Sequence, residues 1–156
     1  MRKRKLYLDA CILVSYYNTK DKEHKKVVDF LEKSLKLDNT ILLCSNFTIA
    51  EFAWVCIKKD YLTEIETYQI ANALFQTSKV GRKYPFKFVN PEANGYSFED
   101  FFLDIQGVIL GTKPRPHLAD AIHIVIMKRD KIIRIVTNNP KDFSVAKIRA
   151  IKPEEI

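Results

Sequence analysis

The sequence has 156 residues, of which 47% are hydrophobic and 12% aromatic, so it excludes a disordered chain and predicts one folded domain over residues 1–156. Its net charge of +7 favours a polyanion such as a nucleic acid as partner, although a Lys-rich solvated surface would give the same balance. Cysteines at 11, 44 and 56 in apolar runs, and no long uncharged stretch, exclude a disulfide framework and a membrane-spanning helix and predict a cytoplasmic protein.

Hydrophobic spacing and turn residues predict strands that alternate with helices along the chain. In chain order we expect a strand at Leu6–Leu8 and an apolar helix after it, a helix from Asp21 to about Leu37, a strand at Ile41–Cys44, a helix from Asn46 or Phe47 to Lys59, a helix from Thr63 to Gly81, a strand at Phe86–Val89, a helix from Ser97 to Gly111, a helix from His117 or Leu118 to about Asp130, a strand at Ile132–Val136, a turn at Thr137–Asp142 and a strand at Lys147–Ile151. Leu6–Tyr17 could alternatively form one helix. The alternation predicts an α/β layered fold with a largely parallel central sheet.

Several predicted helices begin with capping signals. Thr63 with Glu66 and Ser97 with Asp100 have the spacing of a capping pair, in which each residue bonds to the backbone N–H of the other. Asp21 fits an N-cap position. These signals fix the predicted start of three helices.

Three long apolar stretches each contain a single charged residue, and that residue is acidic every time. Asp9 is the only charge between residues 6 and 19, Glu51 the only one between 39 and 57, and Asp120 the only one between 116 and 127. Desolvating an unpaired carboxylate costs on the order of several kcal/mol. A shared cation would offset that cost for all three.

Each acidic residue also has a purely structural interpretation. Asp9 could cap the helix that follows it, and Asp120 would favour the dipole of its own helix. Thr48 with Glu51 matches a capping box if that helix begins as late as Thr48. Taken together, a shared cation explains all three residues better, and carboxylates without thiolate or histidine ligands select Mg²⁺ or Mn²⁺.

The predicted topology would bring these residues to one place. Ligands of parallel sheets bind at the carboxyl ends of the strands, near the switch in strand order. Asp9 follows the first predicted strand, and Asn139 and Asp142 follow the strand that precedes the last. We expect Glu51 and Asp120 in the first turns of buried helices, where their side chains could face the same site.

Four short motifs, in this order, resemble the PIN-domain nucleases. They are Leu6-Tyr7-Leu8-Asp9-Ala10, Thr48-Ile49-Ala50-Glu51, Leu118-Ala119-Asp120-Ala121-Ile122-His123 and Ile135-Val136-Thr137-Asn138-Asn139-Pro140-Lys141-Asp142-Phe143. The resemblance implies a PIN-like three-layer α/β/α sandwich and a metal-dependent ribonuclease. In size the chain is similar to the single-domain VapC-type toxins of that family.

The resemblance also implies a role for each matching residue. Asp9, Glu51 and Asp120 would bind Mg²⁺ or Mn²⁺ and, with Asn139 and Asp142, form the catalytic set. Thr137 would be a polar neighbour of the metal.

Two positions depart from the family pattern. Asn139 stands at the family's fourth acidic position and removes one negative charge there. Cys11 stands where a polar residue, often Asn or Ser, is usual. We interpret His123 as a core or cavity-edge residue rather than as a metal ligand.

Basic residues are expected to bind the RNA, and three tyrosines are candidates for base stacking, although aromatic residues at such spacing are more often core residues. The predicted RNA-binding residues are Lys113, Arg115, Lys79, Arg82 and Lys83, and the candidates for base stacking are Tyr16, Tyr17 and Tyr84. If the protein is a toxin, the resemblance implies a homodimer and an antitoxin whose segment occupies the active site.

Two other functions stay open at this stage. A PIN-like RNA-binding or assembly module without catalytic activity would account for Asn139. A Mg²⁺-dependent enzyme acting on a small phosphate ester is a third hypothesis, but the basic charge and the lack of a nucleophile motif disfavour it.

Overall fold

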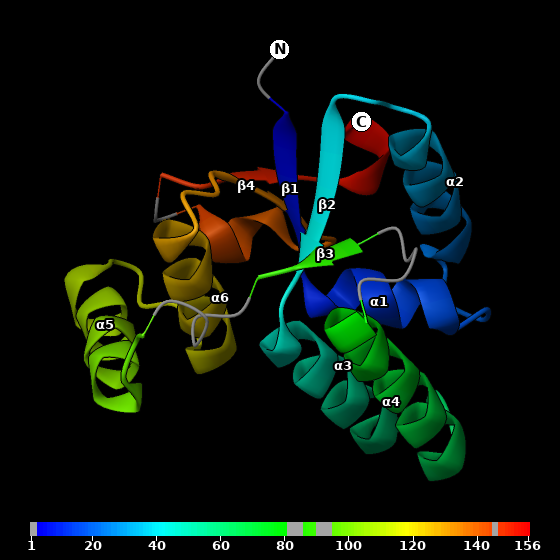
Figure 1. Cartoon of the computed structure of the whole chain (residues 1–156), viewed down its shortest axis with the longest axis horizontal. Coiled ribbons are helices and arrows are strands. Elements are labelled where there is room, and N and C mark those ends of the chain that lie inside the picture. The colour runs from blue at the N-terminus through cyan, green and yellow to red at the C-terminus, as the bar shows by residue number, and fades with distance from the viewer. Residues whose placement is uncertain (1–2, 81–85, 90–94, 145–146) are drawn as a thin grey trace.

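The computed structural model describes residues 3–80, 86–89, 95–144 and 147–156, and within them five strands form one sheet (Figure 1). All neighbouring strands run parallel, in the order β3-β2-β1-β4-β5. The strands are β1 (Arg4–Leu8), β2 (Thr40–Cys44), β3 (Phe86–Phe88), β4 (Arg134–Val136) and β5 (Arg149–Ile151). The predicted parallel sheet is confirmed, and the first segment is a strand followed by a helix rather than one helix.

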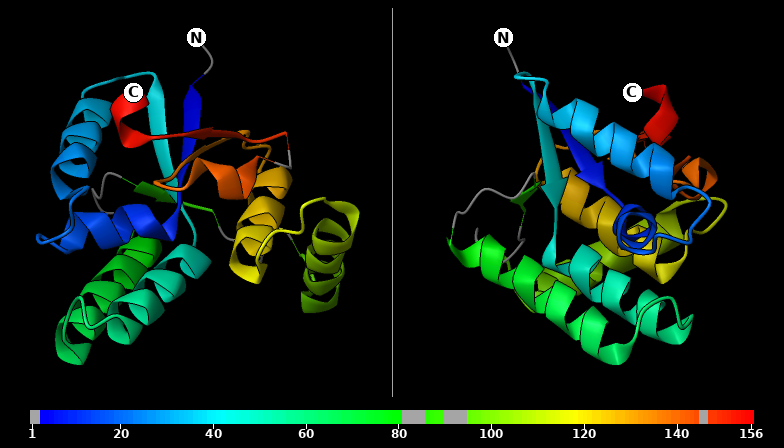
Figure 2. Two further views of the ribbon diagram at one scale, coloured as in Figure 1. Left: turned by 180° about the vertical axis from the view of Figure 1, so that it is seen from behind. Right: turned by 90° about the vertical axis from the view of Figure 1, so that its right-hand side faces the viewer.

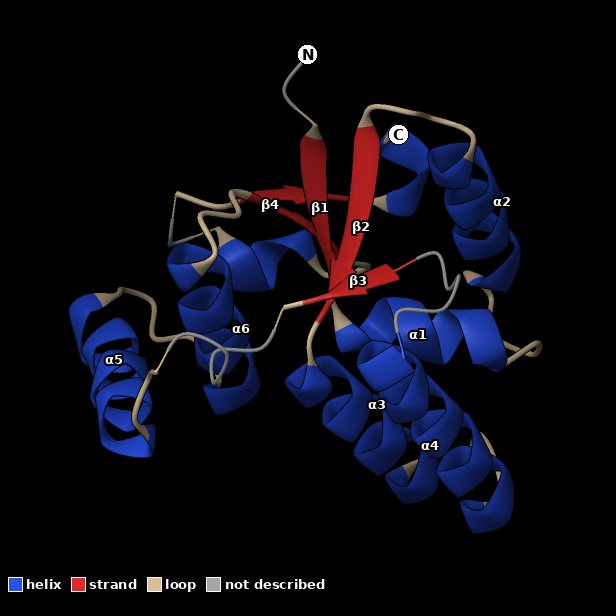
Figure 3. Cartoon of the chain, viewed as in Figure 1, coloured by secondary structure: helices blue, strands red, loops and turns tan. Residues whose placement is uncertain are grey.

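Helices cover both faces of the sheet and give three α/β/α layers (Figure 3). In the described residues they are α1 (Ala10–Tyr17), α2 (His24–Leu35), α3 (Asn46–Lys58), α4 (Glu64–Val80), α5 (Phe98–Gly111) and α6 (Leu118–Arg129), with the short 3₁₀ helix η2 (Pro140–Phe143). Helices α1 to α4 pack mainly on one face, and α5, α6 and η2 on the other, a division that Figure 2 shows from behind. None of the described helices combines the length and apolarity that a membrane span requires.

Two hydrophobic clusters lie on the two faces of the sheet, and successive residues of the inner strands pack alternately into one and the other. Leu6 and Leu8 pack with the cluster of α1 to α4, whereas Tyr7 between them packs with the cluster of α5 and α6. In β4, Val136 packs with the cluster of α1 to α4, and Ile135 packs with the cluster of α5 and α6. Since both faces are buried, the strands need apolar residues at nearly every position, which explains their continuous apolar runs.

Capping hydrogen bonds confirm the predicted starts of α4 and α5. The Glu66 N–H donates to Thr63 Oγ1 at 3.2 Å, and the Asp100 N–H donates to Ser97 Oγ at 3.1 Å. Helix α2 has its N-cap at Glu23, two residues after the predicted N-cap, because Asp21 Oδ1 accepts the Glu23 N–H at 2.8 Å and so stabilises a turn before the helix. The predicted end of α4 at position 81 lies outside the described residues.

The start of α3 differs from the capping box considered for Glu51. Ser45 is the N-cap, and its Oγ accepts the N–H of Thr48 at 3.1 Å. Glu51 therefore lies in the second turn of α3 rather than the first, and the capping interpretation of Glu51 is wrong. Its carboxylate is left available for another role.

The direction in which successive strands are added to the sheet changes at β1. From β1 it proceeds through β2 to β3 on one side, then crosses back to place β4 on the other side of β1. The carboxyl ends of β1 and β4 are adjacent, since the Asp9 N–H donates to the Val136 carbonyl at 3.1 Å. This switch point is where a parallel sheet leaves room for a ligand.

The packing predicts a large stability difference between two matched truncations. Leu6→Ala, at a fully buried position of β1, should lower the free energy of unfolding by about 2–5 kcal/mol, because it leaves a cavity in the core. Ile133→Ala, beside β4 but 58% exposed, should change it by about 0.5 kcal/mol or less. Urea denaturation of both variants would measure this, and equal losses would contradict the described core.

Candidate functional site

All five predicted catalytic residues line one cavity of about 440 Å³ at the carboxyl ends of β1 and β4, which we call the acidic cavity. They are Asp9, Glu51, Asp120, Asn139 and Asp142. They come from the end of β1, from α3, from α6 and from the loop and 3₁₀ helix after β4. Segments more than 100 residues apart in sequence thus meet at the switch in strand order.

Asp9 is held by one of its two carboxylate oxygens. Its Oδ2 accepts a hydrogen bond from Thr137 Oγ1 at 2.6 Å and another from the Cys11 thiol at 3.1 Å. Asp9 occupies the N-cap position of α1, but its side chain makes no capping hydrogen bond. The interpretation of Asp9 as a simple cap is therefore wrong, and its Oδ1 remains directed toward the cavity.

The loop after β4 is fixed to the same carboxylate. The buried Thr137 hydroxyl accepts the Asn139 N–H at 3.0 Å while donating to Asp9. The Cys11 sulfur accepts the Asn138 N–H at 3.3 Å while its own proton points to Asp9. Burial raises the pKa of the Cys11 thiol well above its usual value, so the sulfur stays protonated as a donor. These bonds position Asn139 at the edge of the acidic cavity.

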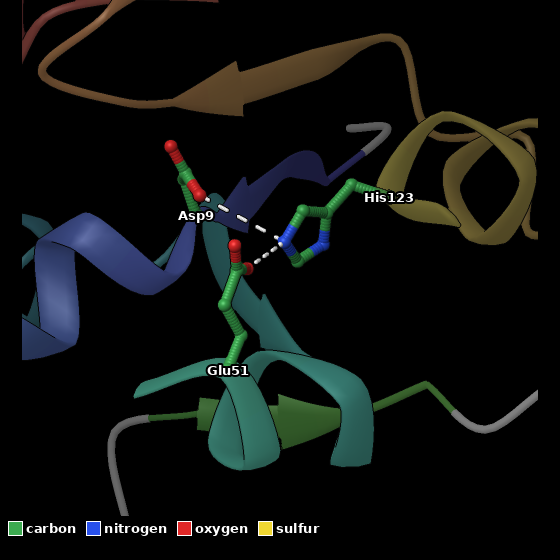
Figure 4. A group of neighbouring side chains, drawn as sticks. All are labelled: Asp9, Glu51 and His123. Atoms are coloured by element: carbon green, nitrogen blue, oxygen red, sulfur yellow. Dashed lines mark hydrogen bonds and ion pairs between the residues drawn. The ribbon is translucent and has the colours of Figure 1, made fainter. Parts of the chain in front are cut away.

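Glu51 contacts a histidine from the opposite layer (Figure 4). His123 Nε2 lies 2.7 Å from Glu51 Oε2 and 3.8 Å from Asp9 Oδ1. The histidine is fully buried, whereas Glu51 is only partly buried. Asp9, Glu51 and His123 each offer one ligand atom, and these atoms lie within 4.8 Å of one another.

Asp120 is half-buried in the first turn of α6, as predicted, among other acids. Burial, together with the negative charges of Asp142 and Asp9, raises the pKa of Asp120 to about 6, and the nearby His123 partly opposes this. Asp142 is exposed in η2 at the mouth of the cavity. The site therefore concentrates negative charge in a protein whose net charge is +7.

The donor set fits a hard divalent cation. Within the described residues, Asp9 Oδ1 and Glu51 Oε1 receive no hydrogen bond, and a nearby positive charge would offset the burial and the neighbouring negative charges that raise the pKa of Asp120. Carboxylate oxygens are the preferred ligands of Mg²⁺ and Mn²⁺. Asp9 and Glu51, which lie in one group with His123, and Asp120, which lines the same cavity, therefore offer carboxylate oxygens to such an ion.

Sequence reasoning missed the place of His123 in this site. It is buried, as expected, but it lies against the acidic residues rather than apart from them. The available signal was its spacing from Asp120, because residues three apart share one face of a helix. Its partner Glu51 lies 72 residues away, and that distance hid the contact.

The predicted RNA-binding residues divide into three groups. Arg115 lines a smaller cavity of about 120 Å³ that shares Asp120 and Asp142 with the acidic cavity, and Lys113 is exposed in the same loop. Nothing is described of the Lys79 side chain, and positions 82 and 83 lie outside the described residues.

Other basic residues at the site were not predicted. Lys141 lines the smaller cavity with Arg115, and Lys22 lines the acidic cavity itself. Lys22 and Lys152 also line a further cavity of about 150 Å³, which shares Asn139 with the acidic cavity. Cationic side chains therefore lie on two sides of the acids.

The tyrosines proposed for stacking have different environments. Tyr16 is 37% exposed, whereas Tyr17 packs against Phe52 with ring centroids 5.5 Å apart. Tyr84 lies outside the described residues. Tyr61, which was not predicted, lines the acidic cavity and is 44% exposed.

Comparisons with known proteins agree with this geometry. Residues 6–88, more than half of the chain, match the family model described as the PIN domain. A comparison with curated proteins finds no match.

Solved structures show the same fold. The Mycobacterium tuberculosis protein VapC20, a sarcin-ricin loop cleaving toxin, has a TM-score of 0.63 and 11% identity over 92% of this chain and 98% of its own. VapBC2 from Rickettsia felis, bound to a promoter DNA fragment, has a TM-score of 0.62 and 14% identity, over 95% of this chain and 98% of its own. FitAcB from Neisseria gonorrhoeae has a TM-score of 0.57 and 16% identity, over 97% of this chain and 99% of its own. At these identities the likeness establishes the fold alone.

The raised pKa of Asp120 predicts a pH-dependent stability difference. The carboxyl binds its proton more tightly in the folded protein, so its stabilising contribution is complete below pH 4 and is lost as the pH rises through about 6. At pH 7.5 without metal, the free energy of unfolding of Asp120→Asn should therefore be about 1 kcal/mol higher than that of the unaltered protein, after discounting for solvent screening. The difference should vanish near pH 4. Denaturation at both pH values in EDTA would measure it. A variant that is less stable at pH 7.5 would contradict the burial and charge repulsion described for Asp120.

Proposed function

The chain belongs to the PIN domain family, and from this premise we propose that it is a metal-dependent endoribonuclease that hydrolyses RNA phosphodiester bonds. One observation carries the proposal. Three carboxylates that are isolated in apolar sequence line one cavity, and neither Asp9 nor Glu51 has the capping role that could have explained it structurally. Bringing like charges together costs free energy, which a bound cation would offset.

Each residue of the proposed site has a distinct task. Asp9, Glu51 and Asp120 would hold Mg²⁺ or Mn²⁺, which when bound activates water and stabilises negative charge on phosphate. Thr137 keeps one Asp9 oxygen occupied and so orients the other toward the cavity. Asn139 and the exposed Asp142 stand at the mouth, where they would hydrogen-bond water and the substrate backbone.

The basic residues on both sides of the acidic cavity support a polyanionic substrate. Arg115 and Lys141 lie on the Asp120 side, and Lys22 and Lys152 on the Asn139 side. Lys26, on the same side as Lys22, is paired with a glutamate at 2.8 Å and is less free to contact phosphate. An RNA strand that crosses the cavity would meet cations before and after the acids.

We extend the proposal to a toxin of a toxin–antitoxin pair that acts in the cytoplasm as a homodimer. Large apolar side chains are exposed on the neighbouring helices α3 and α4: Trp54 (60%), Ile65 (71%) and Tyr68 (71%). Such side chains are frequent at protein interfaces. An antitoxin segment that covers them would lie close to the acidic cavity, since α3 also carries Glu51.

A catalytically silent RNA-binding module is the second candidate function. The observation that favours it is Asn139, which lies at the cavity edge without the charge of an aspartate. Asp142 lines the same cavity and supplies a carboxylate close to that position. We therefore place the active nuclease first.

Removing a charge from the proposed metal site should abolish cleavage. Asp9→Asn and Asp120→Asn should each reduce cleavage of a pool of labelled RNAs at least about 100-fold in Mn²⁺ or Mg²⁺, and EDTA should do the same to the unaltered protein. Asp29→Asn, exposed on α2 away from the cavity lining, serves as the matched control and should cleave normally. Undiminished cleavage by both site variants would overturn the proposal, and RNA binding without cleavage by the unaltered protein would favour the silent module.

Removing cations beside the cavity should weaken RNA binding without abolishing the metal site. Lys22→Ala with Lys152→Ala should lower affinity for single-stranded RNA about tenfold and reduce the slope of log K against log salt by about 1.4, if each lysine contacts one phosphate. Lys33→Ala with Lys36→Ala removes the same charge from an exposed part of the surface as a control. Fluorescence anisotropy over a salt series measures both effects. Equal slopes for the two double variants would contradict the proposed path.

A further inference from the structure

A buried polar network lies beneath the acidic cavity and ends on Glu51. The Tyr7 hydroxyl is 2.9 Å from His123 Nδ1, 2.7 Å from Ser45 Oγ and 3.0 Å from Thr48 Oγ1. All four residues are fully or almost fully buried. The opposite ring nitrogen, His123 Nε2, lies 2.7 Å from Glu51 Oε2 (Figure 4). The network thus joins β1, α3 and α6 to a carboxylate of the proposed metal site.

The protons of this network have a consistent arrangement. The Thr48 N–H donates to Ser45 Oγ at 3.1 Å, and the Ser45 N–H donates to Thr48 Oγ1 at 3.4 Å. The two hydroxyl oxygens also lie 3.0 Å apart, so one hydroxyl can donate to the other, which in turn can donate to the Tyr7 oxygen. A tyrosine hydroxyl carries a proton at neutral pH, and at 2.9 Å the Tyr7 hydroxyl can donate it to His123 Nδ1. The imidazole proton then resides on Nε2 and is donated to Glu51.

The histidine ring has little freedom to turn away from this arrangement. It packs edge-on against Tyr7 and Phe47, with ring centroids 5.5 Å and 5.0 Å apart, and lies 6.5 Å from the ring of Phe143. These contacts come from three different elements, β1, α3 and η2. A ring fixed in this way directs Nε2 at one carboxylate oxygen.

Glu51 and Asp9 are held in matching ways. Thr137 and Cys11 donate to Oδ2 of Asp9, and His123 Nε2 lies at hydrogen-bond distance, 2.7 Å, from Oε2 of Glu51. Within the described residues, the second oxygen of each carboxylate receives no hydrogen bond. Donors behind a metal ligand commonly orient it and increase metal affinity in this manner.

We propose that His123 is a positioning residue that holds Glu51 through its Nε2–H, with Tyr7 fixing the tautomer, so that the cation is bound through oxygen atoms alone. This inference rests on the proposed metal site and deepens it. An all-oxygen site favours Mg²⁺ and Mn²⁺ over softer ions such as Zn²⁺. The opposite arrangement, in which Nδ1–H donates to Tyr7 and Nε2 binds the metal directly, would add a nitrogen ligand.

Calorimetric titration of the folded, metal-free protein with Mn²⁺ tests the positioning role without RNA. His123→Asn keeps a polar group near Nδ1 but loses the donor to Glu51, and Tyr7→Phe loses the group that orients the ring. Each should weaken Mn²⁺ binding about tenfold, and His123→Gln, which keeps a donor near Nε2, should restore most of the affinity. Ser34→Ala removes a buried hydroxyl from α2 and is the control for a general loss of stability, with unchanged Mn²⁺ affinity expected.

Electron spin echo spectroscopy of bound Mn²⁺ separates the two arrangements of His123 even if a variant fails to fold. The unaltered protein should show no coupling to a directly bonded nitrogen, and such a coupling would overturn the proposal. Unchanged Mn²⁺ affinity in folded His123→Asn and Tyr7→Phe would also overturn it while leaving the nuclease proposal intact. If the unaltered protein bound no Mn²⁺, the proposed metal site would fail and this inference with it.

Discussion

The hydrogen bond from Thr137 to Asp9, 2.6 Å long, joins the carboxyl ends of the two strands on either side of the switch in strand order. The two residues are 128 positions apart, so this bond forms only after β4 has been placed beside β1. It leaves one Asp9 oxygen facing the cavity and, through the Asn139 N–H, fixes the loop that carries the remaining polar groups. The rest of the site is arranged around this fixed carboxylate.

The site is electrostatically unfavourable without a cation, and the surrounding fold sustains it. Asp120 has its pKa raised to about 6 by burial and by neighbouring acids. The cost is opposed by donors that are themselves buried, namely Thr137 behind Asp9 and His123 behind Glu51. An acid with a raised pKa in a cavity is more common at functional sites than elsewhere in a protein. The lysine and arginine side chains that line the two neighbouring cavities are suited to a negatively charged substrate, on which a bound metal ion would act.

Helix α3 connects the acidic cavity to the proposed partner surface. Glu51 and Val55 line the cavity, whereas Trp54 and Ile57 on the same helix are exposed. The helix is anchored at its first turn by Ser45, which also belongs to the hydroxyl network beneath His123. A protein that covers the exposed residues would therefore contact the helix that positions Glu51, so binding there and metal binding would share one rigid element.

The sequence by itself determined the layered α/β fold, two capped helices and the three isolated acids, because these depend on hydrophobic period, local hydrogen bonds and the cost of burying charge. Only the tertiary structure decided which donors hold those acids. His123 meets Glu51 across 72 positions, and Lys22 and Lys152 lie near Asn139. The reason is physical: these neighbours are brought together by strand order and helix packing, so no local pattern in the sequence records them.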